Sequence, residues 1–216
     1  MSSTEPENAA VKNPGGVEIQ NARIGKQEII FTGFGGQGIV LAGRILGKAA
    51  AIGDKRHSTL VQAYGPEARG GACSAQVIIS DEPIHYPYVR QPAILACMSQ
   101  SGLDKFIHQM AENGVLLIDQ DLVKPPEKTE DFFSIPSTRM AEEMGRKMMA
   151  NIIMFAFFTS VTGAVSVDAA RMAVRESVPK GTEDMNINAF DKGYDYGVAV
   201  LKARQKKVSA GKGAQP

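Results

Sequence analysis

A glycine-rich turn between a short apolar run and a long apolar stretch constrains the fold of this chain more than any other feature. Residues 28–32 (EIIFT) are rich in β-branched and aromatic side chains and lead directly into GFGGQG at residues 33–38. Residues 39–52 then carry apolar side chains on nearly every face, a pattern that predicts a helix buried against a sheet. The order strand, glycine turn, helix is typical of the first βα unit of a Rossmann-like α/β fold.

The Gly-x-Gly-x-x-Gly spacing predicts a loop that binds an anionic group such as a phosphate. Glycines permit a tight turn and a close approach of the backbone. The first turn of the following helix offers N–H groups and the positive end of the helix dipole. The candidate binding residues of this loop are Gly33, Gly35, Gly36, Gln37 and Gly38. In the alternative interpretation, the glycines only let the loop pack tightly against a neighbour.

A dinucleotide site of the Rossmann type also requires an acidic residue at the end of the second strand, where it holds the ribose. The second predicted strand, residues 57–62, continues into Ala63-Tyr64-Gly65 without an acid. The nearest acid, Asp54, precedes that strand. The glycine loop alone suggests a stand-alone NAD(P)-binding oxidoreductase, but the missing acid and the lack of any catalytic constellation count against this function.

A second glycine-rich loop, YGPEARGG at residues 64–71, joins two predicted strands. Pro66 fixes its own φ and restrains Gly65, so the loop begins stiffly. Arg69 would clamp a phosphate or carboxylate through its two-pronged guanidinium, or it would pair with Glu67 and only hold the loop. Both interpretations stay open. The candidate binding residues of this loop are Tyr64, Gly65, Pro66, Glu67, Arg69 and Gly70.

The remaining pattern alternates strands with helices in the first half and is helical in the second half. Further strands are expected at residues 73–80, 93–98, 115–119 and 132–135, with a helix from the N-cap Ser99 to Asn113. Later helices are expected at residues 137–144, 147–163, 167–177 and 183–204. This order predicts an α/β three-layer sandwich with a mostly parallel or mixed sheet, a Rossmann-like first βα unit and a helical C-terminal part.

The chain divides into one domain and two polar ends. Residues 25–204 form the domain, residues 1–24 are expected to be a flexible arm, and residues 205–216 are expected to be a disordered basic tail. The first residues lack an apolar segment of the kind found in secretory signals, and the longest apolar run, residues 152–158, is too short to span a bilayer. We therefore expect a cytoplasmic protein without a membrane span.

Charge and cysteine usage exclude several kinds of site. The formal net charge of the 216 residues is +1, which argues against a basic nucleic-acid binder. The two cysteines, Cys73 and Cys97, form no Cys-x-x-Cys pair, and the three histidines have no metal-ligand spacing. This chain alone therefore predicts no iron–sulfur cluster, no structural zinc site and no other metal site. Buried, unreactive thiols are the expected state of both cysteines.

The two loops in this order resemble the gamma subunit, or the corresponding domain, of the 2-oxoacid:ferredoxin oxidoreductases. The similarity covers residues 28–200, nearly the whole domain. After FGGQG and YGPEARGG, it continues through NGVLLID at 113–119, Asn151 at the start of an apolar helix that reaches Thr162-Gly163, PKG at 179–181, NINAF at 186–190 and Gly193-Tyr194.

The resemblance implies a subunit of an enzyme that oxidatively decarboxylates a 2-oxoacid to an acyl-CoA and passes electrons to ferredoxin or a similar acceptor. Thiamine diphosphate, Mg²⁺ and iron–sulfur clusters belong to partner subunits: thiamine-binding alpha and beta subunits and a ferredoxin-like iron–sulfur subunit. This chain would supply no catalytic residue. It would pack on the thiamine-binding core and help form the coenzyme A side of the site, with the two loops as candidates for that contact. A purely structural interaction subunit is the remaining alternative.

Overall fold

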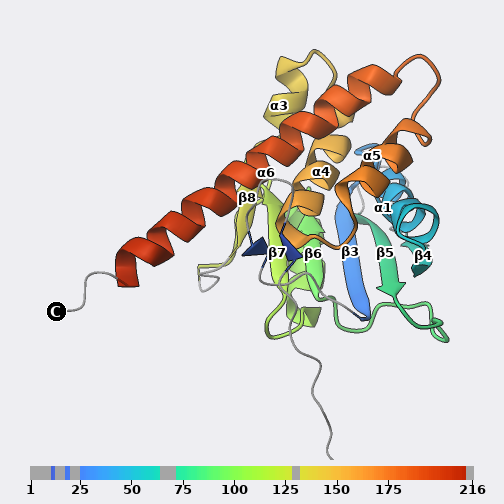
Figure 1. The fold of residues 1–216 in the computed structure, drawn as a ribbon, viewed down its shortest axis with the longest axis horizontal. Helices are drawn as coiled ribbons and strands as arrows, with labels where there is room; N and C mark the ends of the chain where they lie inside the picture. Colours follow the sequence, from blue (N-terminus) through green and yellow to red (C-terminus); the bar gives the residue numbers. More distant parts are fainter. Residues whose placement is uncertain (1–10, 13–17, 20–24, 64–71, 128–131, 213–216) are drawn as a thin grey trace, which may run out of the picture.

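The computed structural model describes residues 11–12, 18–19, 25–63, 72–127 and 132–212. Most of the predicted N-terminal arm and the whole second glycine loop lie outside these residues. Within them, the predicted α/β sandwich is confirmed: helices cover both faces of one central sheet (Figure 1).

The central sheet is six-stranded and mixed, in the order β4-β5-β3-β6-β7-β8. The strands are β3 (Gln27–Phe34), β4 (His57–Ala63), β5 (Ala72–Ser80), β6 (Ile94–Cys97), β7 (Val115–Asp119) and β8 (Phe133–Ile135). β3, β6, β7 and β8 are mutually parallel, whereas β5 is antiparallel to both β3 and β4. A separate two-stranded ribbon pairs β1 (Val11–Lys12) with β2 (Glu18–Ile19).

The position of β5 explains why the second predicted strand carries no ribose-binding acid. In a Rossmann site the second strand lies beside the first, so its end reaches the glycine loop. Here β5 lies between β3 and β4, which moves the end of β4 about 10 Å from the end of β3, because neighbouring strands are about 4.8 Å apart. The sheet therefore lacks the strand arrangement of a dinucleotide site.

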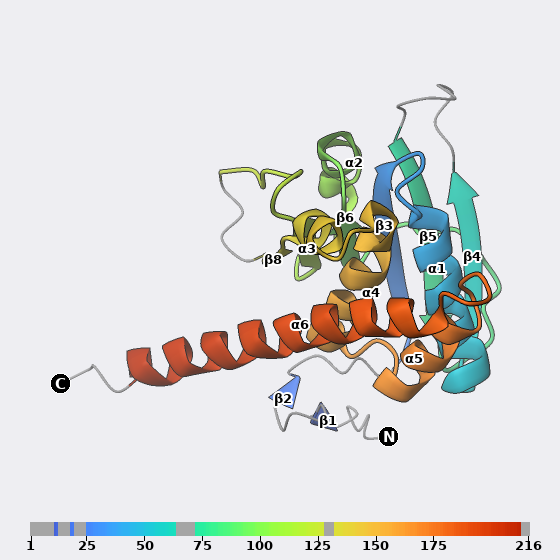
Figure 2. The ribbon, with the colours of Figure 1, turned by 90° about the horizontal axis from the view of Figure 1, so that it is seen from above.

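The helices form two unequal layers, as Figure 2 shows, with α4, α5 and α6 on one side of the strands and α2 on the other. They are α1 (Ile39–Lys48), continued by the π-helix Ala49–Gly53, α2 (Gln100–Phe106), continued by the 3-10 helix Ile107–Gln109, α3 (Ser137–Glu143), the 3-10 helix Lys147–Met149, α4 (Ala150–Thr162), α5 (Val167–Arg175) and α6 (Glu183–Lys212). Each face of the sheet has its own hydrophobic core, and alternate residues of β3 contribute to each. Ile29 and Phe31 pack in the core under the larger helix layer, and Ile30 packs in the core under α2.

Two helices differ in length from the prediction. The helix expected to reach Asn113 ends as a 3-10 turn at Gln109, because the backbone then bonds to the preceding connection, Ala111 N–H to Pro92 and Val115 N–H to Ala93. In contrast, α6 continues through residues 205–212, part of the expected tail. These residues contain no proline, and adding residues to an existing helix is far easier than starting one.

α4 is the centre of the larger layer, and every one of its residues is buried. A helix that is apolar all round belongs inside a protein core, and α4 lies between the sheet and α6 (Figure 1). Its hydroxyl side chains donate to backbone carbonyls of the preceding turn: Thr159 to Phe155, Ser160 to Phe157 and Thr162 to Phe158. In the described part of the chain, no helix has the length and apolar character needed to cross a bilayer.

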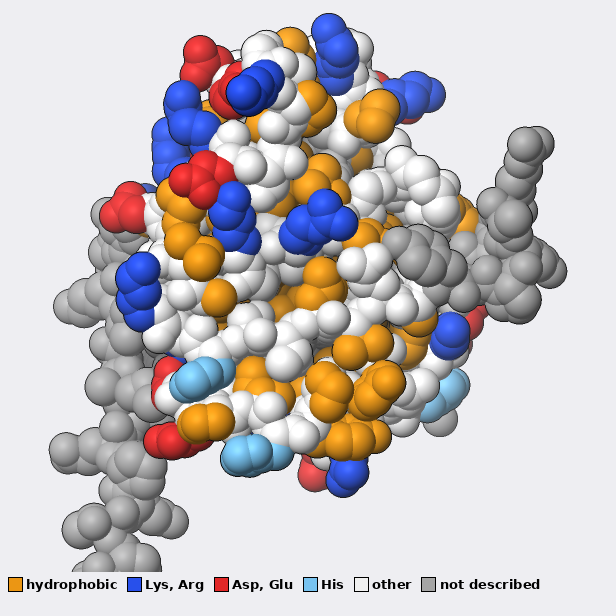
Figure 3. Space-filling view, turned by 90° about the vertical axis from the view of Figure 1, so that its right-hand side faces the viewer, with side chains coloured by type: hydrophobic (Ala, Val, Ile, Leu, Met, Phe, Trp, Pro, Cys, Tyr) orange, Lys and Arg blue, Asp and Glu red, His pale blue; other side chains and the backbone are white. Residues whose placement is uncertain are grey.

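The connection between β5 and β6 presents an aromatic surface. The Glu28 carboxylate accepts hydrogen bonds from the backbone N–H groups of Arg90 and Gln91 at 2.7 and 3.0 Å, which holds the end of the connection. Tyr86 and Tyr88 are about half exposed, and their ring centroids are 5.4 Å apart. Apolar side chains gather in the lower part of the face drawn in Figure 3. The two tyrosines therefore lie on the surface of the described part of the chain.

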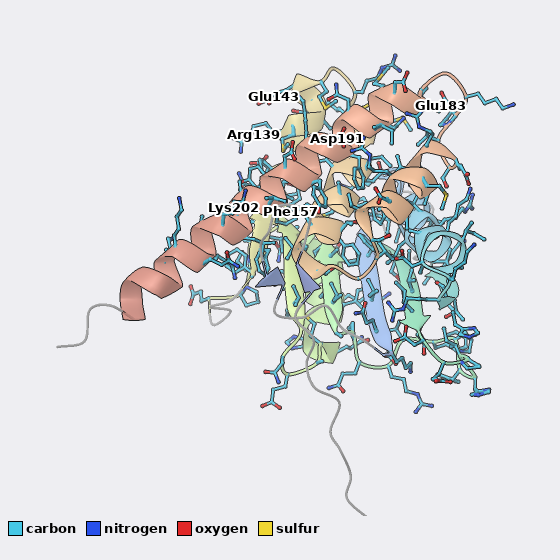
Figure 4. The ribbon with its side chains drawn as sticks, viewed as in Figure 1. Arg139, Glu143, Phe157, Glu183, Asp191 and Lys202 are labelled. Carbon is cyan, nitrogen blue, oxygen red and sulfur yellow. The ribbon has the colours of Figure 1, made fainter. Side chains whose placement is uncertain are left out.

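α6 approaches α4 unusually closely because two of its residues have no side chain. A Cβ atom at Gly193 would lie 2.3 Å from the backbone carbonyl oxygen of Ile153, and one at Gly197 would lie 1.8 Å from Ser160 Oγ. Real Cβ atoms do not approach other atoms this closely, so the two glycines determine how near the helices lie. The ring of Phe157 of α4, which Figure 4 labels, has its centroid 6.0 Å from that of Tyr196 in α6.

We expect Gly193→Ala to destabilise the fold. Alanine is normally the better helix former by about 1 kcal/mol, but here its methyl group would meet the Ile153 carbonyl. The free energy of unfolding should fall by about 1–2 kcal/mol through overpacking, measured by urea unfolding. Gly47→Ala in α1 is the control, since its Cβ would lie 3.3 Å from Ser58 Oγ. A Gly193→Ala variant as stable as the wild type would contradict this packing account.

Candidate functional site

The glycine loop lies at the carboxyl end of β3 and leads into α1. Gly38 is the N-cap of α1 with φ +75°, and Gly36 has φ +92°. Both values lie in the left-handed region, which side chains with a Cβ rarely adopt. The turn closes through the Gln37 N–H, which donates to the Phe34 carbonyl at 3.2 Å. The loop shape therefore depends on glycine at two of the predicted positions.

The glycines of this loop have different surroundings. A Cβ at Gly33 would lie 2.4 Å from Gln37 Oε1, and one at Gly38 would lie 2.3 Å from Asn151 Nδ2. These two glycines are needed for packing within the chain itself. A Cβ at Gly35 meets nothing within 4 Å, and both Gly35 and Gly36 are exposed. The middle of the loop is thus the part that a ligand or partner can approach.

Gln37 holds the loop against the neighbouring strand. Its Oε1 accepts a hydrogen bond from the Phe34 N–H at 2.6 Å, and its Nε2 donates to the Met98 carbonyl, just past β6, at 3.0 Å. Both ends of the side-chain amide are therefore used by backbone groups of this chain. Gln37 therefore fixes the position of the glycine loop relative to the end of β6.

Asn151, at the start of α4, holds the other end of the loop. Its Nδ2 donates to the Gly38 carbonyl at 3.1 Å, its Oδ1 accepts from the Ile152 N–H at 2.9 Å, and the residue is 2% exposed. From the sequence, Asn151 was only part of a family resemblance and not a candidate site residue. The available signal was a lone amide opening an otherwise apolar helix.

No side chain of the helix start neutralises the positive end of the α1 helix dipole. No side chain caps the helix with a hydrogen bond, and its first turn contains no acidic residue. The backbone N–H groups of a helix start and its dipole favour an anion. This uncapped start lies next to the exposed Gly35 and Gly36, so no side chain of the helix start neutralises the dipole there.

The second loop returns to the sheet beside the first. Its predicted residues Tyr64, Gly65, Pro66, Glu67, Arg69 and Gly70 lie outside the described residues. Its two ends are described: β4 ends at Ala63, the Cα partner of Ser74, and β5 begins at Ala72, the Cα partner of Phe34. Phe34 is the last residue of β3 and belongs to the glycine loop. Because it pairs with Ala72, the residue at which the second loop ends, the two loops meet at the same edge of the sheet.

Asp119, at the end of β7, has a structural role. It is fully buried, and its Oδ2 accepts hydrogen bonds from Ser137 Oγ at 2.5 Å and from Thr138 N and Oγ1 at 2.8 and 2.7 Å. Its Oδ1 accepts from the Asp121 N–H at 3.0 Å. The carboxylate therefore holds the start of α3 and is occupied by groups of this chain.

Both cysteines are buried, as expected. Burial raises the pKa of the Cys73 thiol. Burial and the nearby charge of Asp104 raise the pKa of the Cys97 thiol far above its usual range. A raised pKa disfavours the thiolate, which is the form of cysteine that acts as a nucleophile. Among the described residues, no group of three His, Cys, Asp or Glu side chains is placed to hold a metal ion.

Comparison with known proteins identifies the family to which this arrangement belongs. Residues 28–196 match the family described as pyruvate ferredoxin/flavodoxin oxidoreductase. A 2-oxoglutarate synthase subunit KorC from Methanocaldococcus jannaschii is 49% identical over 174 residues, covering 79% of this chain and 93% of that protein.

Two solved structures share the fold. The gamma subunit of a keto/oxoacid ferredoxin oxidoreductase from Geobacter sulfurreducens PCA has a TM-score of 0.74 and 38% identity, covering 81% of this chain and 98% of that one. The 2-oxoglutarate:ferredoxin oxidoreductase from Magnetococcus marinus has a TM-score of 0.72 at 20% identity, covering 81% of this chain and 31% of that one. The glycine loop, the sheet order and these matches agree: this chain belongs to the pyruvate ferredoxin/flavodoxin oxidoreductase family, as a chain of the gamma-subunit type.

Proposed function

We propose that this chain is the gamma subunit of a complex that oxidatively decarboxylates a 2-oxoacid to an acyl-CoA, and that its glycine loops form the coenzyme A side of the active site. The observation that carries the proposal is the uncapped start of α1 behind the exposed Gly35 and Gly36. Coenzyme A carries several phosphate groups, and a glycine loop at a helix start is suited to bind one of them.

The second loop is proposed to complete the coenzyme A contact. Its return at Ala72 pairs with Phe34 in the glycine loop. The guanidinium of Arg69 would bind a phosphate through two parallel hydrogen bonds, and Pro66 would stiffen the start of the loop. The structure from Magnetococcus marinus, which has the same fold, holds 2-oxoglutarate, coenzyme A and succinyl-CoA.

The redox cofactors are proposed to belong to partner subunits. The whole sequence has two cysteines, Cys73 and Cys97, which are too few for a four-cysteine iron–sulfur cluster. Thiamine diphosphate and Mg²⁺ would be held by alpha and beta subunits, and the clusters by a ferredoxin-like subunit. This chain would position coenzyme A while the chemistry takes place on groups held by its partners.

We propose 2-oxoglutarate as the oxoacid, because the 49% identical relative is a 2-oxoglutarate synthase subunit. The complex copurified with this chain should convert 2-oxoglutarate with a kcat/KM at least about tenfold above those for pyruvate and branched-chain 2-oxoacids, a discrimination within the range that a binding site achieves. Acyl-CoA formation with each acid is the measurement. Equal use of pyruvate would contradict the substrate assignment and leave the subunit assignment intact.

Gly35→Ala should impair coenzyme A binding without affecting the fold. The added methyl group meets no atom of this chain within 4 Å, and Gly35 does not have a positive φ, so the melting temperature of the chain should stay the same. A ligand that lies close to the loop would meet the methyl group, and the KM for coenzyme A should rise about tenfold, equivalent to about 1.4 kcal/mol. Gly47→Ala is the control. An unchanged KM would show that coenzyme A does not approach Gly35.

Arg69→Ala should raise the KM for coenzyme A about tenfold to hundredfold, the loss expected for a charge-assisted hydrogen bond of about 1.5–3 kcal/mol. Arg69→Lys should restore affinity only in part, since lysine lacks the planar fork. If Arg69 only pairs with Glu67, then Glu67→Gln and Arg69→Ala should cause similar losses of stability or assembly. A well-assembled Arg69→Ala complex with an unchanged KM would remove Arg69 from the site.

A further inference from the structure

The last turns of α6 extend beyond the domain. Figures 1 and 2 both show α6 continuing past the sheet, with its C-terminal part away from the other elements. The family match ends at residue 196, whereas α6 continues to Lys212. This projecting part therefore follows the region that the chain shares with its family.

The chain concentrates positive charge in this segment. Residues 196–216 contain no Asp or Glu and five basic residues: Lys202, Arg204, Lys206, Lys207 and Lys212. Since the whole chain carries +1 and this segment +5, the remaining residues carry −4. The charge is thus segregated between the domain and the projecting helix, a pattern that indicates a charged partner.

Arg204 fixes the direction in which α6 projects. Its guanidinium lies over the Phe133 ring, 3.7 Å from the ring centroid, and donates to the Phe132 carbonyl. This contact ties α6 to the start of β8. The helix is therefore held at a defined angle to the domain, and Lys206 and Lys207 beyond the contact are both exposed.

One exposed face of the helix combines lysine with small residues. Ala199, Lys202, Ala203 and Lys206 are all exposed, and residues three or four apart lie on the same side of a helix. We call these four residues the α6 basic face. Figure 4 labels Lys202 on the part of α6 that leads out of the domain. Lys202 and Lys206 are four apart, so they repel each other, and residues 196–216 hold no acid to offset this.

We propose that the α6 basic face docks on an acidic surface of a partner subunit in the same complex, an inference that rests on the proposed function. Acidic side chains there would complement the two lysines, and Ala199 and Ala203 would let the partner approach the helix backbone. The face has no large apolar residue that would anchor it in a bilayer. The −4 charge of the remaining chain would oppose binding to a polyanion such as RNA.

The test reverses the charge of this face. Lys202→Glu/Lys206→Glu is compared with Lys180→Glu/Lys192→Glu, which makes the same charge change at exposed lysines before residue 196. The dissociation constant of each variant for the remaining subunits is measured at low and high salt. The first variant should bind about tenfold more weakly at about 50 mM salt, and the difference should shrink at about 500 mM because salt screens exposed charges. The control should stay within about twofold.

Equal affinity of both variants, with the same dependence on salt, would overturn the inference while the complex itself confirms the subunit assignment. A wild-type chain that forms no complex would instead contradict the proposed function, and with it the inference. Homopolymeric RNA and vesicles containing phosphatidylserine are tested with the same variants. If only RNA or vesicle binding responds to the charge reversal, the acidic partner subunit is the wrong occupant.

Discussion

The contact between Asn151 and Gly38 links the glycine loop to the rest of the fold. It joins two segments distant in sequence: the start of α1, which carries the loop, and the start of α4, which is buried in the core. Gly38 has the positive φ that the loop requires. It also has no Cβ atom, which would collide with the side-chain amide of Asn151. One residue therefore satisfies a conformational and a packing requirement at once, and the loop is held by a helix whose residues are all buried.

The same arrangement leaves the middle of the loop free. Gly33 and Gly38 pack against other residues of this chain, so neither position has room for a side chain. The Gln37 amide forms hydrogen bonds with backbone groups at the ends of β3 and β6. Gly35 and Gly36, in contrast, are exposed. A rigid frame with an exposed centre is what a binding loop requires, because little ordering remains to be done when the ligand arrives. The middle of the glycine loop and the α6 basic face are then two separate exposed surfaces of the domain.

Local patterns predicted most of the fold but not its long-range pairing. The strand at 28–32, the glycine turn and the apolar helix at its centre follow from side-chain types and spacing. The antiparallel position of β5 between β3 and β4 does not, because strand patterns do not encode direction or neighbours. The Asn151 contact was missed for the same reason, since no local rule joins an amide to a glycine in a distant segment. The extension of α6 to Lys212 was missed because a basic, polar stretch resembles a tail until it is attached to a helix.

The claim that the glycine loop forms the coenzyme A side of the site is tested most directly by hydrogen exchange in the intact complex. Backbone amide exchange is measured by mass spectrometry with and without coenzyme A. Peptides covering residues 34–41 should exchange more slowly when coenzyme A is bound, whereas peptides covering residues 100–109, on the other face of the sheet, should not change. Unchanged exchange across residues 34–41, in a complex that binds coenzyme A and turns it over, would contradict the account.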